Sequence, residues 1–165
     1  HRALPPPPTR RSSELGEITV VTKDYDARNG TSYIFRSDGP LSATQPNRLT
    51  QVGSILFGSG IRNRISGGDV SSDGRWVIIR YYLHVRLYRR ASGQRVSDAV
   101  LGFYTTIKLA PEPQGEAIAF APSSRSGATE YPIFYTASEL GPKVLNPDQT
   151  MPPISRYSPS STKLN

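Results

Sequence analysis

Asp69 and Glu116 are the residues whose type and placement best suit a chemical role. Each follows a glycine and opens a short apolar segment, as Gly68-Asp69-Val70-Ser71 and Gly115-Glu116-Ala117-Ile118. If these segments are innermost strands of a ring-shaped β protein, both carboxylates point into its central channel. There they could help to bind Ca²⁺, which takes about six to eight oxygen ligands. The alternative is structural, with each carboxylate accepting hydrogen bonds from backbone amides of neighbouring strands.

Two further groups of charged residues are candidates for binding. Lys23, Arg80 and Glu139 are expected at matching ends of strands, where they would form a polar rim around the channel mouth. The net charge of +7 suggests an anionic partner, because lysine and arginine neutralise phosphates. The residues proposed for that surface are Arg62, Arg64, Arg86, Arg89, Arg90 and Arg95. Alternation of basic and apolar residues there is more typical of one solvated face of a strand.

Nucleophilic catalysis has little support in the sequence. The chain has no cysteine, which removes disulfides, thiolate nucleophiles and thiolate metal sites, and it has no Gly-x-Ser-x-Gly motif. His84 is the only histidine besides His1. No glycine-rich loop precedes a helical pattern, so a phosphate-binding loop is not predicted either. These features favour a non-catalytic protein.

Short apolar runs separated by turn residues predict an all-β fold. The expected strands are Ile18 to Thr22, Ser32 to Arg36, Leu49 to Leu56, Gly68 to Ser71, Trp76 to Tyr82, Val85 to Arg89, Thr105 to Leu109, Ala117 to Ala121 and Ile133 to Ala137. Four pairs, Asn29-Gly30, Asp38-Gly39, Asp73-Gly74 and Ser92-Gly93, predict turns with a positive φ at glycine.

The strands recur in groups, which narrows the fold. Trp76 to Tyr81 corresponds to Ile133 to Ser138 and to Ile18 to Lys23. A four-strand unit repeating every 45 to 50 residues or so is typical of β-propeller blades. The chain is therefore expected to form a partial β-propeller of about two to three four-stranded antiparallel blades. Its first copy would begin at the second strand, and its last would end at the third, near residues 143–146.

The incomplete repeats predict that further blades come from elsewhere, and the composition predicts where the folded part begins and ends. The remaining blades are expected from the same precursor or from another chain, because a propeller usually has about four to eight blades. Residues 1–13, with four consecutive prolines, are expected to be a Pro-rich tail, 14–146 the partial propeller, and 147–165 an extended tail. No apolar stretch approaches the roughly 20 residues of a membrane span, and no signal peptide is visible.

Several of these segments resemble a known group of proteins. The segments are Val20 to Asp26, Ser32 to Arg36, Asp69 to Val77 and Pro113 to Phe120. In order and spacing they resemble the C-terminal half of a largely uncharacterised family of secreted bacterial-type β-propellers, related to WD40-like "SPDG" and phytase-like esterase propellers. The resemblance covers roughly Ile18 to Glu139. It departs from the family at Ser72, where proline is usual, and in a longer loop at Ser123 to Glu130.

The resemblance implies a secreted protein, extracellular or periplasmic, and no assigned activity. We therefore expect a non-catalytic propeller module that serves as a binding or structural scaffold, completed by another segment or chain. One alternative is a metal-dependent phosphoesterase-like enzyme with Asp69 and Glu116 in its channel. Another is a protein that binds nucleic acid or another anionic polymer through its basic residues.

Overall fold

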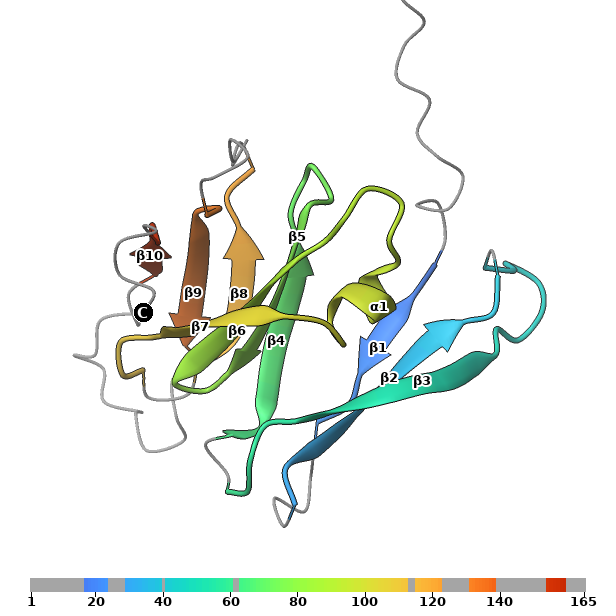
Figure 1. The fold of residues 1–165 in the computed structure, drawn as a ribbon, viewed down its shortest axis with the longest axis horizontal. Coiled ribbons are helices and arrows are strands. Elements are labelled where there is room, and N and C mark those ends of the chain that lie inside the picture. The colour runs from blue at the N-terminus through green and yellow to red at the C-terminus, as the bar shows by residue number, and fades with distance from the viewer. Residues whose placement is uncertain are drawn as a thin grey trace, which may run out of the picture.

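The computed structural model describes residues 17–23, 29–39, 41–60, 63–112, 115–122, 131–138 and 154–159. This part of the chain is all-β, with ten strands in three antiparallel sheets and one short helix. Figure 1 shows the three sheets side by side in chain order. All nine predicted strands are present, with boundaries shifted by at most three residues.

The first sheet has the order β1 (Thr19–Val21), β2 (Thr31–Ser37), β3 (Leu49–Leu56). Its buried side chains include Ile34, which is 0% exposed and belongs to a core shared with the middle sheet. Gly30 enters β2 with φ of 65°, and a Cβ there would lie 2.0 Å from the carbonyl oxygen of Gly58. Only glycine fits this turn, because it adopts a positive φ without strain and has no Cβ.

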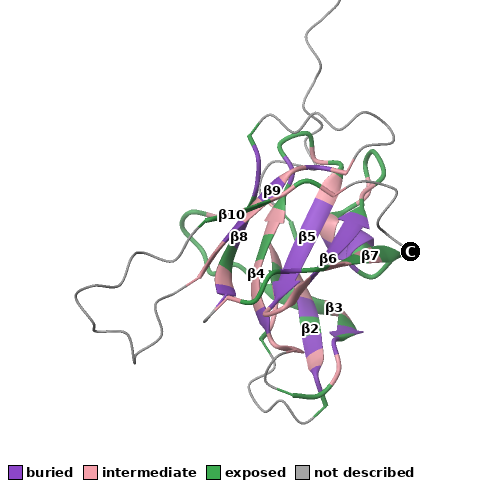
Figure 2. Cartoon of the chain, turned by 90° about the vertical axis from the view of Figure 1, so that its left-hand side faces the viewer, coloured by how far each residue is buried: buried purple, intermediate pink, exposed green. Residues whose placement is uncertain are grey.

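The middle sheet has the order β4 (Ile65–Val70), β5 (Trp76–Tyr81), β6 (His84–Arg89), β7 (Tyr104–Lys108). Figure 2 shows β5 buried almost along its length, which explains its continuous apolar run. Successive side chains of a strand point to opposite faces. Val77 and Ile79 accordingly join the core shared with the first sheet, whereas Ile78 joins the core shared with the third.

The third sheet has the order β8 (Gly115–Phe120), β9 (Phe134–Ser138), β10 (Ser155–Tyr157). β10 lies within the segment 147–165 that was expected to be only an extended tail. The third strand of this repeat was expected near residues 143–146, which lie outside the described residues. The strand found instead pairs with β9 and places Tyr157 against Phe134, with ring centroids 5.0 Å apart.

The sequence predicted that β5 and β9 are corresponding second strands of two repeats, and this correspondence is confirmed. The amide of Ser71 donates to the carbonyl of Trp76 at 3.0 Å, and the amide of Ala121 donates to the carbonyl of Ile133 at 2.9 Å. These bonds occupy the same place in the two sheets. Trp76 and Ile133 therefore correspond, as the sequence predicted.

The correspondence predicted between Asp69 and Glu116 is wrong. β4 pairs Val70 with Val77, and β8 pairs Phe120 with Phe134, so Asp69 corresponds to residue 119. Each sheet has a register shift at the same place, between Ile65 and Gly67 and between Gly115 and Ala117, so the correspondence holds along both strands and Glu116 corresponds to position 66. A glycine followed by a carboxylate is too short a motif to establish which residues of two strands correspond.

Two smaller differences concern the helix and the turns. The four-residue helix α1 (Val96–Ala99) was not predicted, and its residue Ala99 contributes to the first core. The positive φ expected at glycine is found at Gly74 and Gly93 as well as Gly30, but not at Gly39. No helix in the described part of the chain is long and apolar enough to cross a membrane.

Candidate functional site

A cavity of the described structure lies between the first and middle sheets. Its volume is about 710 Å³, and its walls come from β1, β4, β5, α1 and the start of β8. A second cavity of about 350 Å³ continues along β1. Thr19, Val70 and Val96 line both cavities, so together they form one groove beside β1. We call this the β1 groove.

The backbone of β1 has one edge that pairs with β2 and one edge with which no described strand pairs. Thr22 donates to the carbonyl of Tyr33, and the carbonyl of Ile18 accepts from Ser37. Because backbone groups alternate in direction along a strand, the amides and carbonyls of Thr19 and Val21 point away from β2. They point to the side where no described strand pairs with β1. This unpaired edge faces the β1 groove, which Thr19 and Val21 both line.

Both carboxylates singled out in the sequence lie on the wall of this groove, together with Lys23. Lys23 approaches Glu116, with Nζ 3.9 Å from Oε1, and its ammonium lies 5.9 Å from the ring centroid of Tyr82. The sequence placed Lys23 at a rim and Glu116 at a channel, and the structure brings the two together.

Asp69 uses both carboxylate oxygens in hydrogen bonds to the backbone. Oδ1 accepts from the amide of Val70 at 2.8 Å, and Oδ2 accepts from the amide of Phe120 at 2.8 Å. The second bond links β4 of the middle sheet to β8 of the third. Asp69 therefore has the structural role that was weighed against metal binding. No group of three or more metal-ligating side chains occurs among the described residues.

Replacing Asp69 with alanine is expected to lower the free energy of unfolding by about 1.5–3 kcal/mol, because hydrogen bonds to a charged group are lost and the amide of Phe120 loses its acceptor. Urea unfolding measures this change. Asp98→Ala, which removes an exposed carboxylate, is the control and should cost under about 1 kcal/mol. A chelator-dependent loss of stability in the unmodified protein would instead indicate that Asp69 holds a metal ion.

The rim position expected for Arg80 is wrong. Its side chain is 0% exposed, and it pairs with Glu112, with Nη2 2.8 Å from Oε2. Glu112 also accepts a hydrogen bond from Thr136 at 2.5 Å. The arginine therefore joins the middle sheet to the third from inside the protein. Glu139, the other residue expected at the rim, lies outside the described residues.

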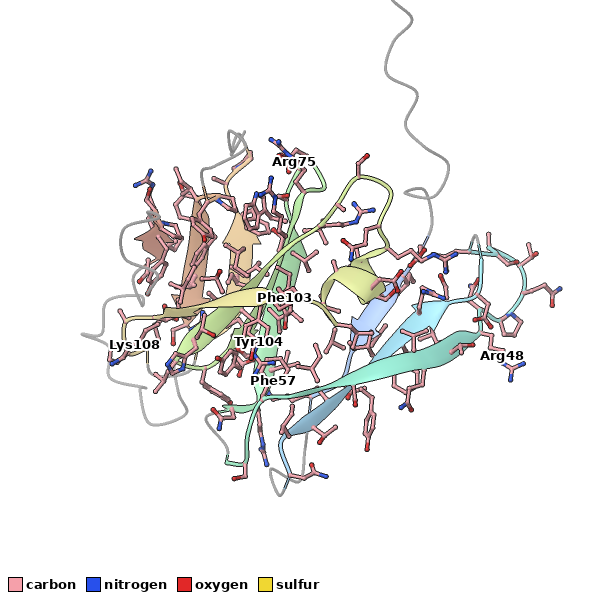
Figure 3. The ribbon with its side chains drawn as sticks, viewed as in Figure 1. Arg48, Phe57, Arg75, Phe103, Tyr104 and Lys108 are labelled. Atoms are coloured by element: carbon pink, nitrogen blue, oxygen red, sulfur yellow. The ribbon has the colours of Figure 1, made fainter. Side chains whose placement is uncertain are left out.

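Among the basic residues proposed as an anionic-partner surface, Arg86 is enclosed by the protein. Arg86 is 9% exposed, and its guanidinium carbon lies 4.2 Å from the ring centroids of both Phe57 and Tyr104. Figure 3 shows these two aromatic residues close together. Arg86 also donates to the carbonyl of Leu56 at 2.8 Å. Its expected place on a partner surface is wrong, because the aromatic rings and this carbonyl enclose its charge.

Two other members of that set, Arg90 and Arg95, both line the second cavity. Arg90 donates to the backbone carbonyls of Gln94 and Gly74. Arg95 lies 3.8 Å from Glu17, Arg89 is exposed, and Arg64 is half-buried. Arg62 lies outside the described residues.

Tyr88 is expected to lower the stability of the protein at alkaline pH. Burial raises the pKa of Tyr88 to about 12, and the charge of Arg86 opposes this rise. An unfolded tyrosine loses its proton near pH 10, so the folded state holds one more proton than the unfolded state between about pH 10 and 12. The free energy of unfolding is therefore expected to fall by roughly 1.4 kcal/mol per pH unit across this range from this group alone.

The matched variant is Tyr88→Phe. The Tyr88 hydroxyl is buried beside Arg86 and makes no well-aligned hydrogen bond among the described residues, so its removal should change stability little at pH 8. Urea unfolding at pH 8 to 11.5 should give a shallower alkaline decline in the variant. Identical declines in the two proteins would contradict the assigned pKa.

Sequence reasoning missed two carboxylates that the structure makes important. Glu112 follows β7, and nothing in its spacing indicates a partner 32 residues away. Glu17 lines the far end of the β1 groove, where Oε1 is buried with no hydrogen-bond partner among the described residues. The alternation that predicted β1 could have directed attention to its flanking charges, Glu17 and Lys23.

Comparison with protein-family models, curated proteins and solved structures finds no match to the chain. The resemblance to secreted propellers therefore stays a prediction from the sequence. What the structure itself supplies is an all-β chain with a groove beside an unpaired strand edge.

Proposed function

We propose that the chain is a non-catalytic binding or scaffold module, a partial β-propeller completed by strands of another segment or chain. An extracellular or periplasmic location belongs to the same proposal. The observation that carries it is the free edge of β1 beside the β1 groove. An exposed edge with an adjacent apolar surface is a site at which a strand can be added.

The internal repeat supports this proposal. β5 and β9 each have a partner strand on both sides, namely β4 and β6 for β5, and β8 and β10 for β9. β1 corresponds to these strands by sequence, yet among the described residues it pairs only with β2. β4 and β8, the strands on the inner side of β5 and β9, also lie against each other. A strand beside β1 would continue this row of inner strands.

Native mass spectrometry of the protein isolated from its own cells tests the proposal. The chain should be recovered in a species heavier than its 18.1 kDa, containing further strand-forming sequence, covalently attached or as a second chain. Recovery only as a folded monomer of 18.1 kDa would overturn the proposal.

A further inference from the structure

We infer that the β1 groove binds an extended peptide that adds a strand to the first sheet, antiparallel to β1, with an acidic residue near its N-terminal end and a basic residue near its C-terminal end. The inference rests on the proposed function and names the partner of that site. This peptide is a segment of a second protein chain.

The backbone of β1 supplies the first part of the argument. Thr19 and Val21 present unpaired amides and carbonyls to the groove, at alternate positions of the strand. Main-chain hydrogen bonds to such an edge give affinity without regard to sequence, and flanking pockets select the side chains. An extended peptide is the ligand whose own backbone matches this spacing.

The direction of the peptide follows from the neighbouring sheets. β4 runs antiparallel to β5, and β8 runs antiparallel to β9, in the position that a strand beside β1 would occupy. A peptide placed in the same way runs from the Lys23 end of β1 to the Glu17 end. Its alternate side chains would meet the apolar wall formed by Val21, Val96 and Val100.

The charges at the two ends of the groove determine which end of the peptide is acidic and which is basic. At one end Lys23 is 38% exposed, and its contact with Glu116, at 3.9 Å, is at the limit of an ion pair. It can therefore take a second carboxylate. At the other end Glu17 Oε2 lies 3.8 Å from Arg95, and its Oε1 is buried without a hydrogen-bond partner among the described residues. A buried carboxylate oxygen needs a donor, which an arginine or lysine of the peptide would supply.

The probe is a peptide with blocked ends that copies Gly115–Phe120 and ends in an added arginine. It carries a glutamate near its N-terminus and apolar residues after it, as the groove requires. Binding to the whole chain is measured by fluorescence anisotropy or by NMR titration. Saturable binding that moves the signals of Thr19 and Val21 is expected, and no binding at millimolar peptide would overturn the inference.

Backbone methylation separates strand addition from adsorption. Two versions of the peptide carry N-methyl groups on alternate residues, one on the odd positions and one on the even. One version should bind at least about tenfold more weakly, because its methyl groups block the bonds to β1, while the other binds within about twofold of the parent. Equal affinities of the two versions would overturn the inference.

Variants of the protein test each part of the groove. Thr19→Pro removes an outward amide and should weaken binding by at least about tenfold, whereas Thr19→Val keeps that amide and should retain affinity. Glu17→Gln should weaken binding of the arginine-ended peptide more than of an alanine-ended one. If Thr19→Pro fails to fold, the methylated peptides decide the question by themselves.

The two proposals can fail separately. A heavy native species together with a peptide that does not bind would leave the proposed function standing and overturn this inference. A folded native monomer that nevertheless binds the peptide in one methylation pattern would support the groove as a peptide site and overturn the completed propeller.

Discussion

Arg80→Ala is expected to lower the free energy of unfolding by about 3–5 kcal/mol, because it leaves the carboxylate of Glu112 buried without its charged partner. The guanidinium also donates to the carbonyl of Ala117 at 2.8 Å, so the variant breaks a second link between the middle and third sheets. No side chain fits at Gly115 beside this arginine, since a Cβ there would lie 1.6 Å from Nη2. Urea unfolding followed by circular dichroism measures the loss.

Arg75→Ala is the matched control for Arg80. Arg75 also forms an ion pair at 2.8 Å, with Asp73, but its side chain is 47% exposed, and Figure 3 shows it at the end of β5. An exposed pair of this kind contributes under about 1 kcal/mol. The double variant Arg80→Met/Glu112→Gln removes both buried charges and should recover part of the loss. Equal effects of Arg75→Ala and Arg80→Ala would contradict the assignment of Arg80 to the interior.

Phe134→Ala is expected to cost about 3–5 kcal/mol, the usual range for removing a buried aromatic ring. Phe134 is 0% exposed and stacks on Tyr157 of β10 at an interplanar angle of 9°. The hydroxyl of Tyr157 in turn accepts from the amide of Ala110 at 2.9 Å. Losing the ring removes the surface on which β10 rests, so protection of β10 amides from exchange should also fall.

Phe103 offers a control of the same chemistry, because it is 100% exposed. Phe103→Ala should change the free energy of unfolding by less than about 0.5 kcal/mol. A comparable loss in both variants would mean that Phe103 is covered in solution. No loss in Phe134→Ala would contradict the packing of β10 on the third sheet.

The strands could be predicted from the sequence because burial imposes a pattern on them. In Trp76 to Ile79 the residues facing both cores are apolar, and this run predicts the strand. β10 has no such run. Its three residues, Ser155 to Tyr157, are polar apart from the ring of Tyr157, and the strand depends on its contact with β9. Local sequence contains no trace of that long-range contact.

The charged residues were harder to predict than the strands for a related reason. An arginine near the end of an apolar run is expected in solvent, and only the fold shows that Arg80 meets a carboxylate contributed by the segment after β7. The exposed position expected for Arg86 was wrong for the same reason, because its partners are aromatic rings from distant parts of the chain. Lys23, Asp69 and Glu116, which were expected at a channel or its rim, all line the β1 groove, although their contacts are mostly with the protein itself.

Residue-resolved amide hydrogen exchange along β1 tests the central claim most directly. In the purified chain the amides of Val20 and Thr22, which point toward β2, should exchange slowly, whereas those of Thr19 and Val21 should exchange at least about tenfold faster because the edge is free. Adding the partner strand should slow the second pair to the rate of the first. Equal protection of all four amides in the purified chain, or no change on adding the strand, would contradict the claim that β1 is an edge awaiting a partner.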